Sequence, residues 1–205
     1  MRLIDLSQPV FDRCPNCPAH APVRVELGAT HEKDGWRLEM LTLASHTGSH
    51  VDAPLHKLAG AASLDDIPLE RFVGQAFVAD LLSRTMRQPL EDRIVLLATG
   101  WGDRRLANEE WYYRSPHVTV DGAEWLVRHK VRGVGIDHYS IAGAAEPNNA
   151  RVHEVLLGAG VWIVEELRFP PDVFGLPQPV TFWSLPVNFK GFTGAFCRPV
   201  VVAES

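Results

Sequence analysis

Three histidines and one aspartate fall within eleven residues of this 205-residue chain. The segment reads His-Thr-Gly-Ser-His-Val-Asp-Ala-Pro-Leu-His and runs from His46 to His56. Imidazole and carboxylate are the ligands that a borderline divalent ion such as zinc or manganese prefers. A lone histidine is usually a surface residue or a hydrogen-bonded core residue. Four such side chains at this spacing instead indicate a metal site.

The same segment is a poor helix. Gly48 lowers helix propensity, and Pro54 lacks an amide hydrogen and keeps the preceding residue out of the helical region. The two-histidine pattern of helical zinc sites is therefore disfavoured here.

A straight strand does not bring the ligands together either. His46 and His50 would share one face of such a strand but lie about 13 Å apart. The chain must therefore bend at 47–49, where a glycine tolerates unusual backbone angles. We interpret His46, His50 and Asp52 as ligands on a loop followed by a strand. His56 lies beyond the proline and could be close to the ion without being a ligand.

This run resembles the signature of the bacterial kynurenine formamidase-like "cyclase" family of metal-dependent hydrolases, His-x-Gly-Thr-His-x-Asp-x-Pro-x-His. The chain departs from that signature only at Ser49, a conservative change. The resemblance covers nearly the whole chain, from an opening segment at 3–10 to a Gly-rich stretch at 191–198. It implies an α/β fold of the three-layer, swivelling β/β/α type, with residues 1–205 forming a single domain, and a homodimer.

The resemblance also adds site residues that spacing alone would not select. His153 begins a segment similar to the family's His-x-x-Leu-Leu, and Glu165 lies in one similar to Ile-Val-Glu-Asn-Leu. By this match, His153 and Glu165 complete a site for one or two divalent ions, zinc or manganese, with Asp52 shared, and His56 is the catalytic acid/base. Taken alone, Glu165 would be a solvated carboxylate at a strand end, and His153 a histidine on a helix face.

The activity that the resemblance implies is hydrolysis of an aryl formamide such as N-formylkynurenine, a reaction of tryptophan breakdown. An alternative is the same chemistry on a cyclic amide such as isatin. A third possibility is a metal-binding protein without activity. His56 argues against that third possibility, because an imidazole beside a site already supplied with ligands serves proton transfer rather than metal storage.

An aromatic substrate calls for stacking surfaces, and Trp101 and Trp36 are our candidates, with a core position as the alternative for both. Cys14 and Cys17 form a CxxC pair in a Pro-rich segment, where the family carries larger apolar residues. With no second CxxC, a thiol pair in the core or the pocket wall is favoured over redox or metal use, and Cys17 is a candidate substrate contact.

Apolar periodicity and turn residues predict a mixed α and β chain. The expected strands are 2–6, 23–28, 36–44, 50–53, 75–81, 93–98, 133–137, 161–165, 181–185 and 196–203, and the expected helices are 66–72, 104–112, 121–130 and 148–157.

Composition fits an ordinary soluble enzyme, and the small aromatic amide substrate and the absence of nucleic-acid or membrane partners are our expectations. Hydrophobic residues make up 46% of the chain and charged residues 22%, both near globular averages. The net charge is −5 and no basic run occurs, which disfavours nucleic acid and anionic membranes as partners. The N-terminus shows no signal-peptide core, so we expect a cytoplasmic protein.

Overall fold

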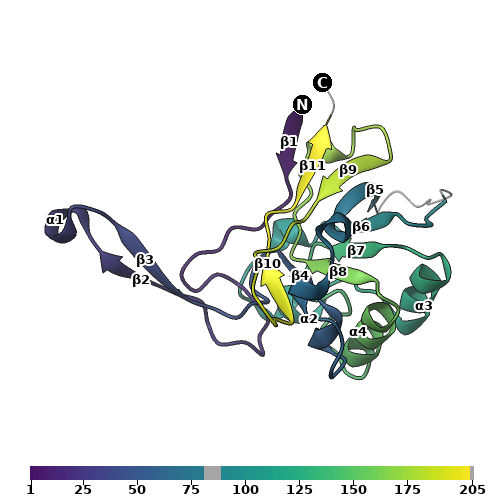
Figure 1. The fold of residues 1–205 in the computed structure, drawn as a ribbon, viewed down its shortest axis with the longest axis horizontal. Helices are drawn as coiled ribbons and strands as arrows, with labels where there is room; N and C mark the ends of the chain where they lie inside the picture. Colours follow the sequence, from purple (N-terminus) through teal and green to yellow (C-terminus); the bar gives the residue numbers. More distant parts are fainter. Residues whose placement is uncertain (81–88, 204–205) are drawn as a thin grey trace.

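The structure, a computed structural model, describes residues 1–80 and 89–203. Its main feature is one nine-stranded mixed sheet with the strand order β1-β11-β9-β5-β6-β7-β8-β4-β10 (Figure 1). The strands of this sheet are β1 (Arg2–Asp5), β4 (His50–Asp52), β5 (Val73–Asp80), β6 (Ile94–Ala98), β7 (Gly133–Ile136), β8 (Trp162–Glu165), β9 (Val180–Trp183), β10 (Gly194–Phe196) and β11 (Val200–Ala203).

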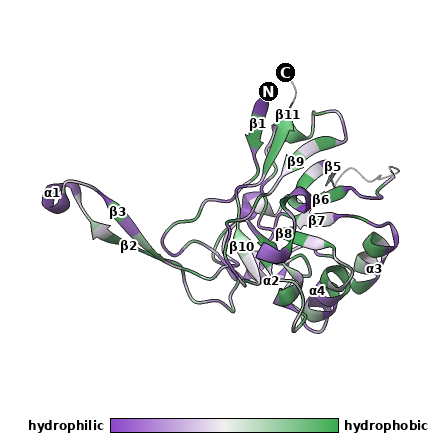
Figure 2. Cartoon of the chain, viewed as in Figure 1, coloured by the Kyte–Doolittle hydropathy of each residue, from purple (hydrophilic) through white to green (hydrophobic). Residues whose placement is uncertain are grey.

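The centre of the sheet is parallel and buried on both faces. Strands β5, β6, β7 and β8 pair in parallel, whereas the strands at both flanks pair antiparallel. Parallel strands covered on both faces read as continuous apolar runs, as in Ile-Val-Leu-Leu-Ala of β6. Figure 2 shows β6 and β11 as strongly hydrophobic segments.

Helices cover one face of the sheet, and the curled sheet folds over the other. Helices α3 (Val120–Arg128) and α4 (Asn148–Gly158) pack on the first face through an apolar cluster that includes Leu126, Leu156 and Ile163. In the second cluster, side chains from both ends of the sheet meet, since it joins β1 and β11 to β4 and β10. The α/β fold predicted from the sequence is confirmed.

A long hairpin extends away from this body. Strands β2 (Arg24–Ala29) and β3 (Leu38–Thr42) pair only with each other, and the short helix α1 (His31–Asp34) lies at their tip (Figure 1). Along it, Leu27, Met40 and Leu41 leave more than half of their surfaces exposed, at 58%, 56% and 57%.

Two of the predicted helices are wrong in whole or in part. The segment 66–72 forms two 3-10 turns, Leu64–Asp66 and Leu69–Phe72, because Pro68 between them cannot continue a helical hydrogen-bond ladder. The helix expected over 104–112 begins only at Glu109, as α2 (Glu109–Tyr113), where the Asn108 side chain caps it by accepting a hydrogen bond from Trp111 N.

The predicted strand 196–203 is in fact two strands at different places in the sheet. β10 pairs with β4, whereas β11 pairs with β1 and β9. Pro199 lies between them and has no amide hydrogen for a ladder. Residue 81 of the predicted strand 75–81 lies outside the described residues. None of the helices in 1–80 and 89–203 has the length and apolarity to cross a membrane.

Candidate metal centre

The predicted bend between the first two histidines is present. Gly48 has a φ of 62°, the left-handed region that glycine adopts most readily. The turn brings the ring centroids of His46 and His50 to 5.1 Å, far closer than a straight strand allows. The two imidazoles can therefore serve one site.

Strand pairing then adds the carboxylate that is distant in sequence. His50 of β4 lies opposite Glu165 of β8 in the antiparallel register, and Asp52 is two residues farther along the same face of β4. His153 is on α4, which packs on β8. Sheet register and helix packing thus bring Glu165 and His153 to the cluster. Sequence spacing alone did not predict that these two residues lie there.

Five side chains converge around Asp52, namely His46, His50, His56, His153 and Glu165. His46 Nδ1 is 2.7 Å from Asp52 Oδ1, and His50 Nε2 lies 3.4 Å from both Asp52 Oδ1 and Glu165 Oε2. His153 Nε2 lies 3.4 Å from Glu165 Oε1. Among the described residues, two groups of three side chains could each hold an ion. Within each group the ligand atoms all lie within 4.8 Å of one another, and both groups include Asp52. These groups are His46, Asp52 and His56, and His50, Asp52 and Glu165.

The rings of the three predicted histidine ligands are held by hydrogen bonds on their other nitrogens. His50 Nδ1 donates to the Gly48 carbonyl and His153 Nδ1 to the Asn149 carbonyl, both at 2.7 Å. His46 Nε2 lies 2.9 Å from Thr193 Oγ1. Such partners fix the tautomer and orientation of an imidazole at a metal site.

The cluster is closed on one side and open on the other. The side chains of Asp52, His50, His153 and Glu165 are at most 4% exposed, whereas His46 is 10% exposed and His56 is half-buried. Burial lowers the pKa of His56 to about 4. Burial also lowers the pKa of His50, but the Glu165 hydrogen bond and the Asp52 charge outweigh it and raise that pKa to about 9. Because His46 and His56 are the most exposed members of the cluster, substrate and water can reach it from the His56 side.

Ser49, the one departure from the family signature, makes two hydrogen bonds through its hydroxyl. Ser49 Oγ donates to the Glu166 carbonyl at 2.6 Å and accepts from Gln8 N at 2.9 Å. This hydroxyl ties the bend to the residue that follows Glu165 and to the N-terminal segment. A threonine hydroxyl could make the same two bonds, which explains why the change is conservative.

The candidate substrate contacts do not share one location. Trp36 lies between α1 and β3 at the tip of the hairpin and is 53% exposed. Trp101 is a core residue, packed with Trp111 and Tyr139, and its indole donates to the Trp111 carbonyl. Cys17 packs partly buried against this aromatic group, and burial raises its pKa, as expected for an unreactive thiol in a wall.

Sequence reasoning missed a buried ion pair beside the cluster. Arg105 Nη2 is 2.8 Å from Glu166 Oε2, with 6% and 1% of the two side chains exposed. Glu166 follows Glu165 directly and has a left-handed φ of 52°, which turns its side chain away from its neighbour's. Arg105 also donates to the carbonyls of Pro9 and Pro15 at 2.8 and 2.6 Å. Nothing in local spacing connects residues so far apart.

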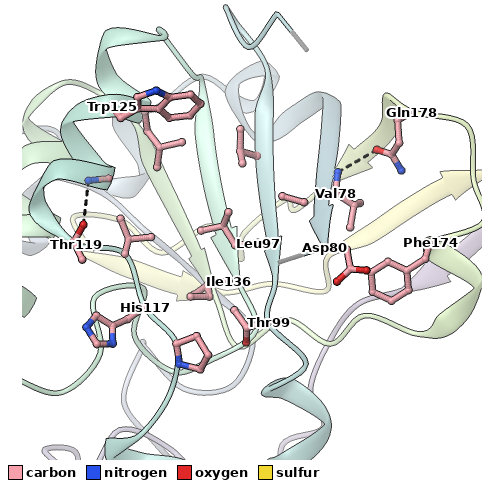
Figure 3. Close-up of a pocket in the computed structure, with 16 residues that line it drawn as sticks. Val78, Asp80, Leu97, Thr99, His117, Thr119, Trp125, Ile136, Phe174 and Gln178 are labelled. Atoms are coloured by element: carbon pink, nitrogen blue, oxygen red, sulfur yellow. Dashed lines mark hydrogen bonds between the residues drawn. The ribbon is translucent and has the colours of Figure 1, made fainter. Parts of the chain in front are cut away.

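A wide cavity lies away from this cluster. It measures about 890 Å³ and is lined mainly by apolar side chains of α3 and β5–β7, among them Leu97, Trp125 and Ile136 (Figure 3). None of the predicted ligands lines it. Cavity size alone would thus point to a part of the fold other than the predicted ligand cluster.

Comparisons with known proteins identify the family of this chain. Residues 4–142 match the protein family described as "Putative cyclase". The kynurenine formamidase of Salinibacter ruber is 40% identical over 215 residues, covering 98% of this chain and 97% of the relative. That of Bacillus mycoides is 28% identical over 208 residues, with 97% and 96% covered. Among solved structures, isatin hydrolase A from Labrenzia aggregata superposes with a TM-score of 0.82 at 26% identity, over 99% of this chain and 94% of that one. The chain therefore belongs to the cyclase family.

Proposed function

We propose that this protein is a metal-dependent amide hydrolase that cleaves aryl formamides such as N-formylkynurenine. The observation that carries the proposal is the convergence of His46, His50, His153, Glu165 and Asp52, with the half-buried His56 at the open side. The relatives named as kynurenine formamidases support the substrate class. A pure storage site would not need an imidazole at its mouth.

The residues present fit a divalent ion. Asp52 Oδ2 is buried and has no hydrogen-bond partner among the residues described, an arrangement that is costly for a carboxylate unless a cation satisfies it. Imidazole and carboxylate donors suit zinc, with manganese as the alternative. Asp52 belongs to both donor groups, but one of them includes His56, the proposed proton carrier, so the donor set supports one or two ions per chain. When bound, such an ion polarises a carbonyl and makes water easier to deprotonate near neutral pH.

The protein's own groups then perform the proton transfers. His56 is placed to accept a proton from the water that attacks the formyl carbon. It delivers that proton to the amine nitrogen as the carbon–nitrogen bond breaks, so that formate and an aromatic amine leave. The hydrogen bonds from His50 and His153 to backbone carbonyls keep the cluster fixed during this change.

The direct test is turnover of N-formylkynurenine by protein loaded with zinc or manganese, beside a chelated sample. We expect kynurenine release with a kcat/KM on the order of 10⁴ M⁻¹s⁻¹ or above, abolished by chelation and restored by the metal. Metal-loaded protein that leaves N-formylkynurenine intact would contradict the proposed substrate.

A cyclic amide is the second candidate substrate, and the similarity to isatin hydrolase A favours including it. Opening isatin would use the same cluster and the same proton transfers. The greater identity to a kynurenine formamidase, 40% against 26%, places aryl formamides first. Isatin belongs in the same assay, because preferential turnover of it would reassign the substrate without changing the site.

We also propose that two chains form a homodimer through the hairpin β2–β3. Its exposed side chains include Leu27, Met40, Leu41 and Trp36, and an isolated two-stranded hairpin is marginally stable in water. Sedimentation equilibrium should give twice the mass of one chain, and Leu41→Glu should shift the protein toward monomer. A wild-type monomer at micromolar concentration would refute this. The cytoplasmic location stays a prediction.

A further inference from the structure

A fifth histidine, outside the family signature, lies beside the cluster. His20 is half-buried, and its ring centroid is 6.4 Å from that of His46. His46 also adjoins His56, with ring centroids 4.2 Å apart, and is the most exposed of the predicted ligands. His20 therefore lies near the part of the cluster that a substrate can reach.

His20 lacks the protein partner that the predicted histidine ligands have. Neither of its ring nitrogens has a hydrogen-bond partner within residues 1–80 and 89–203, although Nδ1 is shielded from solvent. An unpaired nitrogen in such a position costs free energy. Five histidines lie at or beside the cluster. Besides His20, only His56 has a ring that makes no hydrogen bond to the described residues, and His56 is the one assigned to act on substrate.

The segment that carries His20 is fixed in place. His20 N donates to the Cys17 carbonyl at 3.0 Å, and Asn16 Nδ2 donates to the Ala21 carbonyl at 3.2 Å, so the turn is closed. Arg105 holds the start of this segment through the Pro9 and Pro15 carbonyls and pairs with the residue that follows Glu165. The position of His20 relative to the cluster is thus set by hydrogen bonds and a buried ion pair rather than left to a free loop.

The surroundings favour an uncharged imidazole. Burial lowers the pKa of His20. In that form the ring offers one N–H donor and one acceptor. It can bind a polar group of either kind without burying a charge.

We propose that His20 is a specificity-determining residue that hydrogen-bonds the polar amino-acid arm of the substrate, away from the bond that is cleaved. The reacting end of the substrate is already served by His56 and the cluster, which leaves the unpaired His20 for a group farther along the molecule. The inference rests on the proposed function, since it assumes an aryl formamide with such an arm.

The test compares two substrates in the wild-type protein and three variants. N-formylkynurenine carries the amino-acid arm, whereas formanilide has the same formamide on a bare ring. With His20→Ala we expect about a tenfold rise in KM for N-formylkynurenine, the effect of losing one hydrogen bond, with kcat nearly unchanged and formanilide kinetics within about twofold of wild type. His20→Gln, which keeps a donor and an acceptor, should recover part of the loss. His129→Ala, which changes the exposed histidine directly after α3, is the matched control.

The outcomes separate this inference from the function on which it rests. Equal losses on both substrates, or no loss on either, would overturn the role of His20 while leaving the formamidase intact. Metal loss on His20→Ala, measured by mass spectrometry of the bound ion, would make His20 a ligand and overturn the role as well. Wild-type protein that cleaves neither formamide would refute the proposed function itself, and the inference with it.

Discussion

Asp52→Ala is expected to lose bound divalent metal and, with it, nearly all amide hydrolysis. Asp52 is the side chain that both candidate ligand groups share, 2.7 Å from His46 and 3.4 Å from His50. Removing a hydrogen-bond partner outside the coordination sphere already lowers metal affinity about 10- to 100-fold. Loss of a shared ligand should cost more. Bound metal after gel filtration and kcat/KM for N-formylkynurenine measure the two effects.

A second buried aspartate provides the matched control. Asp137 is as buried as Asp52, but its carboxylate accepts hydrogen bonds from Thr99 and from Gly102 N and touches no predicted ligand. The Asp137→Asn protein should therefore retain bound metal, even if the substitution weakens the turn at residues 99–102. Asp52→Asn, which preserves shape, separates loss of charge from loss of packing. An Asp52→Ala protein that holds metal and works at the wild-type rate would show that this cluster is not the metal centre.

The sequence predicts what is local to eleven residues. The bend at Gly48, the extended segment that follows it and the shared face of His50 and Asp52 all depend on backbone rules that act over a few positions. The central strands β6, β7 and β8 could also be predicted, because strands buried on both faces are continuous apolar runs. Local rules therefore suffice for the first half of the site.

The rest of the site depends on contacts between distant segments. The His46–Thr193 hydrogen bond spans 147 positions and the Ser49–Glu166 bond spans 117. Family resemblance supplied His153 and Glu165, but no resemblance or spacing pointed to His20 or Arg105. Trp36 was predicted as a substrate contact, and it lies exposed at the tip of a hairpin whose position no local pattern reveals.

His56→Ala is expected to keep the metal and lose about 10²- to 10⁴-fold in kcat, the usual contribution of a general acid–base group. His56 follows the ligand strand at the end of a 3-10 turn, Pro54–His56, and faces the open side of the cluster. Its imidazole has no hydrogen-bond partner within the described residues that would hold the ring as a structural group. Single-turnover kinetics on metal-loaded protein measure the chemical step directly.

Metal content must be measured together with the rate, because it decides whether His56 is a proton carrier or a ligand. His56 belongs to one of the two groups whose ligand atoms lie within 4.8 Å, so its distance alone would also suit a ligand. A proton carrier and a ligand differ in what their removal leaves behind. Without a proton carrier the ion stays and the leaving amine is no longer protonated. Substrates with better leaving groups should then lose less rate. Without a ligand the ion departs and all substrates lose rate together. A His56→Ala protein with full metal and a loss that shrinks as the leaving group improves would establish proton transfer, whereas parallel loss of metal and activity would reassign His56 to the coordination sphere.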